Sequence, residues 1–327
     1  MRRTFVVGCP RSGTTVVQAM LARHPEVFTL PETAFFLRLL GGTAYRWGDR
    51  DAKAPRERLA RRLGLARRYG RREFLDLQRS LLGKLPPHSH APWREETCAT
   101  RFFEILDNLT ERASRSMWIE KTPAHLLYLD DIEHYLPDAR FVHVIRPGID
   151  VMASLLDANM RYDASNAFGG DLARWVGRWN RAAEIHRAHI GSPHHHFVFL
   201  EDLTRDPDGE WQRLCQFLEL PAEARLDEAC KQTISYPELE PWKQAALSGQ
   251  PHQTASKVNE VFGPRLRDWL RHKLVSYEAL YAASSLAFER SESYGHNPAE
   301  KALPGKAADS GRAQGHSARR ASGQSGS

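Results

Sequence analysis

Apolar and polar positions follow two different periods along most of this chain. Short apolar runs that are typical of buried strands cover residues 4–8, 27–30, 116–120, 140–145 and 196–200. Between these runs, apolar residues recur every three or four positions, which predicts helices over residues 15–23, 33–40, 55–82, 97–115, 148–159, 170–189 and 209–218. Because strands alternate with helices, we expect an α/β fold with a mainly parallel sheet flanked by helices on both faces.

The predicted folded part ends before the C-terminus. An amphipathic pattern over residues 265–288 predicts one last helix, and after Asn297 the chain is rich in Ala, Gly and Ser without an apolar period. So little apolar surface cannot offset the entropy lost on ordering. We therefore expect a single domain over residues 1–297 and a disordered tail over residues 298–327.

The composition narrows the class of protein. Of the 327 residues, 41% are hydrophobic, which is enough for a core, and the net charge of +6 favours an anionic ligand over nucleic acid. The four cysteines show no paired spacing that would indicate a zinc site or a disulfide framework. No apolar run approaches the roughly 20 residues that span a bilayer, and the first strand leaves no room for a signal peptide. We expect a soluble, cytoplasmic protein without an integral membrane segment.

The first predicted strand leads into a loop between two glycines. Residues 4–15 are Thr-Phe-Val-Val-Gly-Cys-Pro-Arg-Ser-Gly-Thr-Thr, and the two glycines have the spacing of a P-loop, G-x-x-x-x-G-K-[ST]. Thr14 stands where that pattern has its lysine, which argues against ATP or GTP hydrolysis. The donors that remain are backbone N–H groups at a helix N-terminus, the hydroxyls of Thr14 and Thr15, and the cation of Arg11. They predict a P-loop-type cradle for a shorter phosphate chain.

A second candidate anion site follows the fourth predicted strand. Arg146 leaves the strand, residues 147–148 form a Pro-Gly turn, and Ser154 lies about two turns into the next helix. Residues seven to eight positions apart share a helix face, so both side chains can face the crevice at the strand ends. An arginine fork and a hydroxyl suit a phosphate. Taken alone, a strand-end salt bridge and a helix cap explain the two residues equally well.

These two sites together resemble those of the sulfotransferases that use 3′-phosphoadenosine 5′-phosphosulfate (PAPS), in the bacterial and tyrosylprotein-like branch. The likeness runs in order from about Thr4 to Tyr294. The resemblance implies that Arg146 and Ser154 bind the 3′-phosphate, with Ser256 and Lys257 on a closing loop over the cofactor. It implies that the 5′-phosphosulfate is held by Pro10, Arg11, Ser12, Gly13, Thr14 and Thr15.

The rest of the likeness concerns catalysis. Glu120-Lys-Thr-Pro123 is similar to the middle lysine motif of the family, and residues 199–207 and 214–220 resemble its strand and helix near the adenine. The resemblance implies in-line transfer of a sulfonate to a hydroxyl of a small molecule, carbohydrate or peptide, leaving adenosine 3′,5′-bisphosphate (PAP). Arg11 would act at the sulfonate and Lys121 at the bridging oxygen. We expect no metal to be required, because these cations supply the charge that Mg²⁺ supplies to kinases.

The resemblance leaves two candidates for the general base. The cytosolic branch has a histidine two positions after the lysine, where this chain has Pro123, and the nearest histidine is His125. The tyrosylprotein-like branch uses a glutamate after the first helix, and Glu32 stands there. Glu32 could equally serve only to stabilise the N-terminus of its own helix. Many members also carry a tyrosine where Leu200 stands. We expect Glu32 rather than His125 to be the base.

Other interpretations stay open at this point. A nucleotide or small-molecule kinase on the same fold, or a non-catalytic nucleotide-binding protein, would share the loop. The arginines of residues 56–72 suit a solvated helix face, with leucines 59, 63 and 65 as a buried stripe, or a lid over an anionic acceptor or a membrane surface. His194-His-His196 has the composition of a metal cluster, but neighbours on a strand alternate sides, which favours a polar loop.

Overall fold

A computed structural model of the protein describes residues 1–53, 62–83, 90–161, 171–226, 246–251 and 256–295, together with Ile234 and Gln244. The tail expected at residues 298–327 lies outside the described residues. None of the described helices is both long and apolar enough to cross a bilayer.

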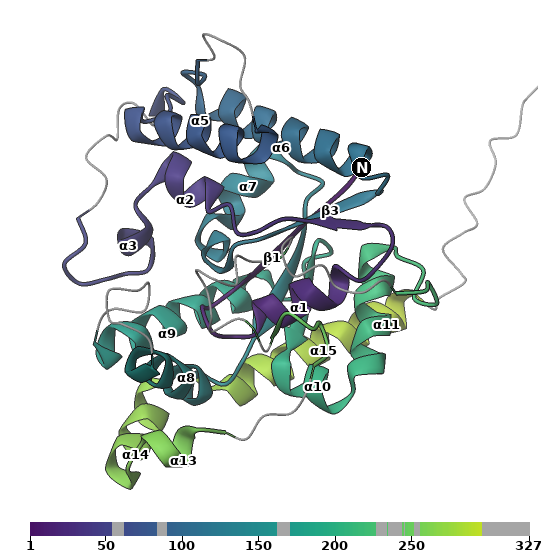
Figure 1. The fold of residues 1–327 in the computed structure, drawn as a ribbon. Coiled ribbons are helices and arrows are strands. Elements are labelled where there is room, and N and C mark those ends of the chain that lie inside the picture. Colours follow the sequence, from purple (N-terminus) through teal and green to yellow (C-terminus); the bar gives the residue numbers. More distant parts are fainter. Residues whose placement is uncertain are drawn as a thin grey trace, which may run out of the picture.

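Five parallel strands form one sheet in the order β2-β3-β1-β4-β5 (Figure 1). The strands are β1 (Arg2–Gly8), β2 (Val27–Thr29), β3 (Met117–Lys121), β4 (Arg140–Ile145) and β5 (His195–Phe199). Each lies within one or two residues of a predicted strand, so the predicted parallel sheet is confirmed. Because β1 lies between β3 and β4, the carboxyl ends of these three strands meet at one edge of the sheet.

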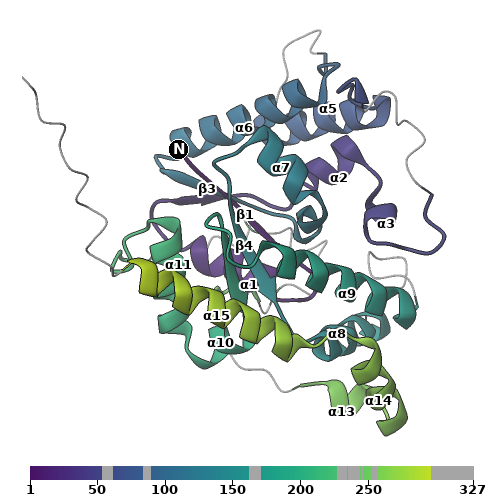
Figure 2. The same cartoon turned by 180° about the vertical axis from the view of Figure 1, so that it is seen from behind.

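Helices cover both faces of the sheet, as the sequence predicts (Figures 1 and 2). On one face, Val6, Val142 and Val198 pack against three helices: α1 (Thr14–Leu21), α10 (Leu200–Arg205) and α11 (Pro207–Leu218). On the other face, Phe5 and Phe141 belong to a larger core. That core is covered by α2 (Phe35–Leu40), α5 (Arg68–Leu82), α6 (Glu95–Arg112), η1 (Pro123–Tyr128), α7 (Leu129–Tyr135), α8 (Gly148–Arg161), α9 (Leu172–His189), α14 (Pro264–Lys273) and α15 (Tyr277–Gly295).

The structure corrects two of the predicted helices. The helix expected over residues 265–288 is two helices, α14 and α15, because Ser276 begins a new one: its Oγ accepts a hydrogen bond from Ala279 N at 3.1 Å. Short helices that the apolar period did not predict are α3 (Thr43–Arg46), α7, α10 and α13 (Val258–Val261).

The arginine-rich segment also differs from its prediction. Residues 54–61 lie outside the described part, and α5 begins only at Arg68. Gly64 has φ of +65°, and Leu65 forms a β-bridge with Arg94, so no continuous helix joins the two halves. Leu63 is 60% exposed and Leu65 37% exposed. The buried stripe is therefore wrong for these two leucines, while Leu59 lies outside the described residues.

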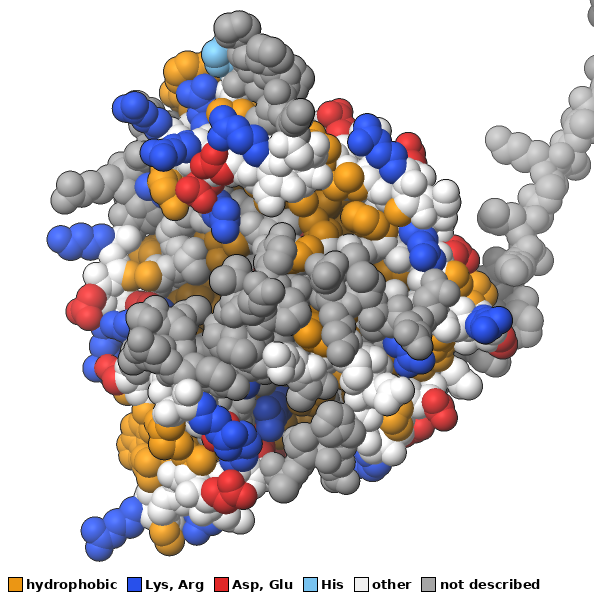
Figure 3. All heavy atoms as spheres, in the orientation of Figure 1, with side chains coloured by type: hydrophobic (Ala, Val, Ile, Leu, Met, Phe, Trp, Pro, Cys, Tyr) orange, Lys and Arg blue, Asp and Glu red, His pale blue; other side chains and the backbone are white. Residues whose placement is uncertain are grey.

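The arginines of α5 lie mainly on its solvent side. Arg68, Arg72 and Arg79 are exposed, and Figure 3 shows basic side chains mixed with acidic ones over this helix. Arg71 instead turns inward and donates to the carbonyls of residues 91 and 92. The basic face of α5 is thus a solvated helix face in the part of the chain that the structure describes.

Candidate functional site

The candidate site lies where three neighbouring strands end. Lys121 is the last residue of β3 and pairs with Val6 of β1, while Gly8 of β1 pairs with Val144 of β4. Arg146 follows two positions later. Parallel strands place their carboxyl ends on the same edge, where ligands of open α/β sheets bind. The topology therefore brings the glycine loop, the lysine and the arginine together.

The loop after β1 has the backbone of an anion cradle. Arg11 and Gly13 have φ of +73° and +99°, in the left-handed region, and Gly13 is the N-cap of α1. A Cβ atom on Gly8 would lie 2.5 Å from the carbonyl oxygen of Val144. The loop can therefore lie close against β4 only because this position has no side chain. The first N–H groups of α1 have no intrahelical acceptors, so an anion placed at this end of the helix could accept from them.

The buried hydroxyl of Ser12 indicates whether the loop fits an anionic ligand. Its side chain is 1% exposed, and its Oγ has no hydrogen-bond partner among the described residues. A buried hydroxyl without a partner costs about 1–3 kcal/mol, so such a group is expected to have a use. A phosphate oxygen in the loop would accept the hydroxyl hydrogen, which fits the predicted cradle.

Lys121 and Glu32 form an ion pair beside the glycine loop. Lys121 is fully buried, and its Nζ lies 2.5 Å from Glu32 Oε1 and 3.4 Å from Thr15 Oγ1. The Glu32 side chain is 28% exposed, so an acceptor can reach it from solvent. Glu32 does not cap a helix: α2 begins at Phe35 with Ala34 as its N-cap. The carboxylate instead lies against the ammonium.

A buried carboxylate holds the Glu32 segment on β3. Glu120 Oε1 accepts from the backbone N–H of Thr33 at 3.2 Å and from its hydroxyl at 2.7 Å, and also from the Thr122 hydroxyl at 2.7 Å. Glu120 Oε2 accepts from His125 at 2.7 Å. Burial alone would raise the pKa of Glu120, but His125 and the hydroxyl donors outweigh it and leave that pKa below its ordinary value. Sequence reasoning missed this role, although a charged residue inside an apolar strand was a signal for it.

His125 belongs to this buried network. Its ring is fully buried, and Nε2 accepts from the backbone N–H of Phe36 at 3.2 Å. Nε2 therefore carries no proton, and Nδ1 donates to Glu120. Both ring nitrogens are engaged inside the protein. The geometry thus gives His125 a positioning role and does not support it as the base.

Arg146 lies at the end of β4 with its guanidinium largely buried. Burial lowers the pKa of Arg146 from its ordinary value, although the negative charges of Asp150 and Glu201 act to raise it. Within the described part of the chain, Arg146 forms no ion pair. Its carbonyl accepts from Trp179 Nε1 at 3.2 Å, which fixes the backbone here. A mostly buried cation without a carboxylate partner favours an anionic ligand.

Ser154 lies on α8 and contacts Arg11 of the glycine loop. Its Oγ accepts from Arg11 Nε at 3.1 Å, and Arg146 Nη1 lies 3.5 Å from the Arg11 carbonyl oxygen. The structure therefore brings Arg11, Arg146 and Ser154 together, as expected for neighbouring phosphate sites. The Arg11 side chain points toward the Ser154 side, although the sequence predicted it at the sulfonate.

The structure also places Ser256 and Lys257 beside α8. Ser256 Oγ donates to Asp150 Oδ1 at 2.7 Å, and Lys257 Nζ pairs with Asp157. Both aspartates lie on the helix that carries Ser154, so the turn before α13 is tied to the wall of the Arg146 site. Residues 252–255, which directly precede Ser256, lie outside the described residues.

Leu200 covers the glycine loop from the β5 side. A Cβ atom on Gly13 would lie 2.7 Å from Leu200 Cδ1. An aliphatic side chain therefore packs directly over the loop at this position.

The histidine run at residues 194–196 does not form a cluster by itself. His195 Nε2 lies 2.7 Å from Glu133 Oε1 of α7, whereas His196 Nε2 lies 3.3 Å from Glu210 Oε1 of α11. Those two helices cover opposite faces of the sheet. His194 is exposed. The strand alternation predicted from the sequence thus separates the three side chains.

Comparisons with known proteins give a family for this arrangement. The family model described as "Sulfotransferase family" matches residues 4–224. Over 221 residues the chain is 23% identical to protein-tyrosine sulfotransferase A of Caenorhabditis elegans, covering 66% of this chain and 50% of that protein. Over 224 residues it is 26% identical to the protein-tyrosine sulfotransferase of Drosophila melanogaster, covering 66% of this chain and 38% of that protein. The chain thus spans half or less of these relatives.

Solved structures of sulfotransferases are also similar. A sulfotransferase domain from the curacin biosynthetic pathway shares 16% identity over 83% of this chain and 98% of that chain, with a TM-score of 0.45. A mouse sulfotransferase complexed with PAP shares 11% identity over 89% of this chain and 88% of that chain, also with a TM-score of 0.45.

Proposed function

The chain belongs to the sulfotransferase family, and on that premise we propose that it transfers a sulfonate group from PAPS to a hydroxyl acceptor. The observation that carries the proposal is the ion pair of Lys121 with Glu32 beside the glycine loop. This pair puts a cation and a proton acceptor next to a cradle that has Thr14 in place of a triphosphate-binding lysine. The reaction releases PAP.

The donor would be held by two groups of residues. The loop of residues 10–15 would hold the 5′-phosphosulfate through backbone N–H groups and the hydroxyls of Ser12, Thr14 and Thr15. Arg146 and Ser154 would bind the 3′-phosphate, and the contact of Arg11 with Ser154 supports a share for Arg11 in that site. Ser256 and Lys257, tied to α8, would close over it. PAPS supplies the sulfonate and its leaving group.

The chain's own residues supply the proton chemistry. Glu32 would accept the proton of the attacking hydroxyl through a carboxylate oxygen, since it is the half of the pair that solvent reaches. Lys121 would donate a hydrogen bond to the bridging oxygen, where negative charge develops. Glu120 positions Glu32 by holding the adjacent Thr33. We propose that these cations replace a metal in the reaction.

Among hydroxyl acceptors, we propose a peptide tyrosine as the first class to test. The matched relatives are named as protein-tyrosine sulfotransferases. Sugars and small natural-product alcohols form the comparison set, because residues 32–98 and 241–257, where we expect the acceptor to bind, carry no motif for one class.

The test measures product and donor binding separately. The full chain is incubated with PAPS and a panel of tyrosine peptides, sugars and small alcohols, and sulfated product is detected by mass spectrometry. Binding is measured as the thermal shift with PAP. We expect Glu32→Gln to lower kcat about 10²- to 10⁴-fold, the usual contribution of a general base, while the PAP shift persists.

Glu26→Gln is the matched control. Glu26 is a partly exposed carboxylate that pairs with Arg2 at the amino-terminal end of the sheet, far from the loop. It should retain both activity and the PAP shift. No PAP shift in the wild-type chain would refute the donor site, and full activity in Glu32→Gln would refute the assigned base. Consumption of ATP with Mg²⁺, without product from PAPS, would indicate a kinase instead.

A further inference from the structure

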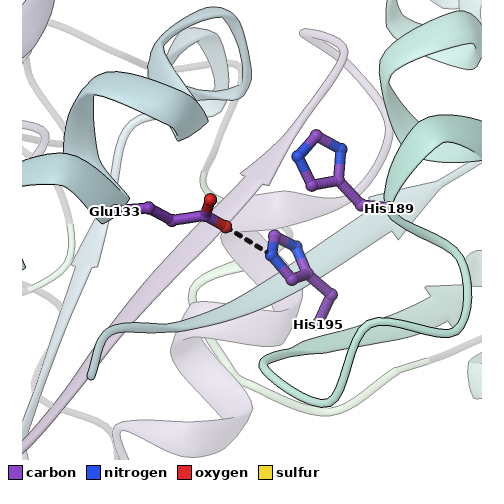
Figure 4. Close-up of side chains that lie close together, drawn as sticks. All are labelled: Glu133, His189 and His195. Atoms are coloured by element: carbon purple, nitrogen blue, oxygen red, sulfur yellow. Dashed lines mark hydrogen bonds and ion pairs between the residues drawn. The ribbon is translucent and has the colours of Figure 1, made fainter. Parts of the chain in front are cut away.

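We propose that Glu133, His189 and His195 form a binding site for a divalent transition metal ion, for which Zn²⁺ is the best chemical match. The three side chains converge from α7, from the last turn of α9 and from the start of β5 (Figure 4). One possible ligand atom of each lies within 4.8 Å of the others. This site is separate from the proposed reaction, which we expect to need no metal.

The site lies at the other end of the sheet from the glycine loop. His195 pairs with Phe141 near the start of β4, and Arg146 follows Phe141 by five residues. At a rise of about 3.3 Å per residue, the two places are about 16 Å apart along the strand. A metal here would join α7, α9 and β5 without touching the phosphate site.

His189 is already oriented as a ligand. Its Nδ1 lies 2.9 Å from the carbonyl oxygen of Ile185, and a carbonyl can only accept, so Nδ1 carries the proton. In the neutral ring, Nε2 therefore has its lone pair available. Metal-binding histidines characteristically donate their other N–H to such a carbonyl, which fixes both ring orientation and tautomer.

His195 contacts a second histidine, His143, through its other ring nitrogen. Its Nδ1 lies 2.8 Å from His143 Nε2, and His143 Nδ1 lies 2.8 Å from His186 Nδ1. With the contact of His195 Nε2 to Glu133, this chain has three hydrogen bonds. Three neutral imidazoles carry three ring protons, so every bond has one proton and no ring needs to be charged.

The protons of this chain can point in either direction. In one direction His186 donates to His143, His143 donates to His195, and His195 donates to Glu133. In the other, His195 donates through Nδ1 to His143, and His143 donates through Nδ1 to His186. His195 Nε2 then presents a lone pair to a metal, and Glu133 presents a carboxylate. Metal binding therefore needs a tautomer change in the chain but creates no buried imidazolium.

The spacing of the ligand atoms is close to what Zn²⁺ requires. Ligands at about 2.0–2.1 Å in a tetrahedron lie about 3.3 Å apart. The 2.7 Å between His195 Nε2 and Glu133 Oε1 must widen slightly, and the longer separations must shorten by up to about 1.5 Å. Glu133 is 39% exposed and can adjust its rotamer. Two imidazoles and one carboxylate favour Zn²⁺ over Mg²⁺ or Ca²⁺, which prefer oxygen ligands.

The first experiment measures affinity. The full chain is freed of metal with a chelator, and Zn²⁺ binding is measured by competition with a chromophoric chelator. We expect one site per chain, with affinity falling at least about tenfold in Glu133→Gln and in His189→Ala. His272→Ala is the matched control, because His272 makes the same Nδ1 contact to a carbonyl four residues earlier, on exposed α14. It should bind as wild type does.

The second experiment reads the histidine chain directly. In the chain labelled with ¹⁵N at histidine, Zn²⁺ should move the ring proton of His143 from Nε2 to Nδ1, although His143 is not a ligand. A histidine that merely lay near a surface-bound ion would keep its tautomer. The proposal is overturned if Glu133→Gln and His189→Ala bind Zn²⁺ as tightly as wild type, or if the His143 resonances do not change.

Discussion

Replacing Glu120 by glutamine tests the network that positions the proposed base. The substitution keeps the shape of the side chain and an oxygen at the Oε1 position, which accepts from Thr33 and Thr122. It puts an N–H₂ group where Oε2 accepts from His125. His125 cannot adapt by moving its proton to Nε2, because Nε2 accepts from Phe36 N. With the proton on Nδ1, His125 faces the new amide N–H₂ group of the variant. With the proton on Nε2, it would face the N–H of Phe36.

The expected cost follows from these contacts. A buried donor without an acceptor costs about 1–3 kcal/mol, and the three donors that remain lose the added strength of a charged acceptor. We expect Glu120→Gln to lower the free energy of unfolding by about 2–4 kcal/mol at pH 7. Urea titration followed by circular dichroism measures this quantity.

The effect should also depend on pH. The folded pKa of Glu120 lies below its ordinary value, so the folded state binds fewer protons than the unfolded state as the pH falls. The ionised carboxylate therefore stabilises the wild type above about pH 4.3, and this contribution is lost as the pH falls through the folded pKa. Glu120→Gln lacks this titration, so the difference between the two proteins should shrink on acidification.

Glu210→Gln is the matched control for Glu120→Gln. Glu210 is also a buried carboxylate paired with a histidine, but it belongs to α11, on the other face of the sheet. Both variants should lose stability, and only Glu120→Gln should lower kcat, because Thr33 follows Glu32 directly. Stability within 0.5 kcal/mol of wild type, or an unchanged difference between pH 7 and pH 4, would refute this account of the network.

Three further substitutions test the donor site. Gly13→Ala should lose about 1–3 kcal/mol of stability and the PAP shift, because the φ of +99° at Gly13 and its contact with Leu200 both oppose a Cβ atom. The control is Gly48→Ala, where φ is +76° and the space around the glycine is open; it should lose less stability and keep the PAP shift. Arg146→Lys should weaken PAP binding in calorimetry about tenfold or more, because an ammonium cannot reproduce a bidentate fork; unchanged affinity would contradict the clamp. Ser12→Ala should raise the unfolding free energy without ligand by up to about 1–3 kcal/mol, because it removes a buried hydroxyl that has no partner among the described residues, while weakening PAP binding; equal PAP affinity would show that its hydroxyl does not contact the donor.

The sequence predicted those features that depend on local pattern. The strand ends that carry the glycine loop, Lys121 and Arg146 were predictable, because apolar runs locate parallel strands and parallel strands align their carboxyl ends. The break between α14 and α15 was predictable in principle, since Ser276 is a good N-cap residue. The continuous apolar period across the break concealed it.

Contacts between distant segments were not predictable in this way. Glu120 accepts from Thr33, which is 87 residues away, and no spacing rule relates the two positions. The same limit applies to His125. His125 is the histidine nearest to Lys121 in sequence, which made it a candidate base, whereas the N–H of Phe36 decides that Nε2 is occupied. Which candidate lies beside the ammonium therefore depends on the packing of α2 against η1.

The histidine run shows why strand alternation is necessary but insufficient for finding a site. Alternation predicts that His195 and His196 face opposite sides of the sheet, and their contacts with Glu133 and Glu210 agree. The argument excludes a cluster made by the run alone, yet it does not exclude partners from other elements. His189 lies six positions earlier on α9, and Glu133 comes from α7, so only the fold brings them to His195. A run of histidines at the start of a buried strand is therefore best searched one face at a time.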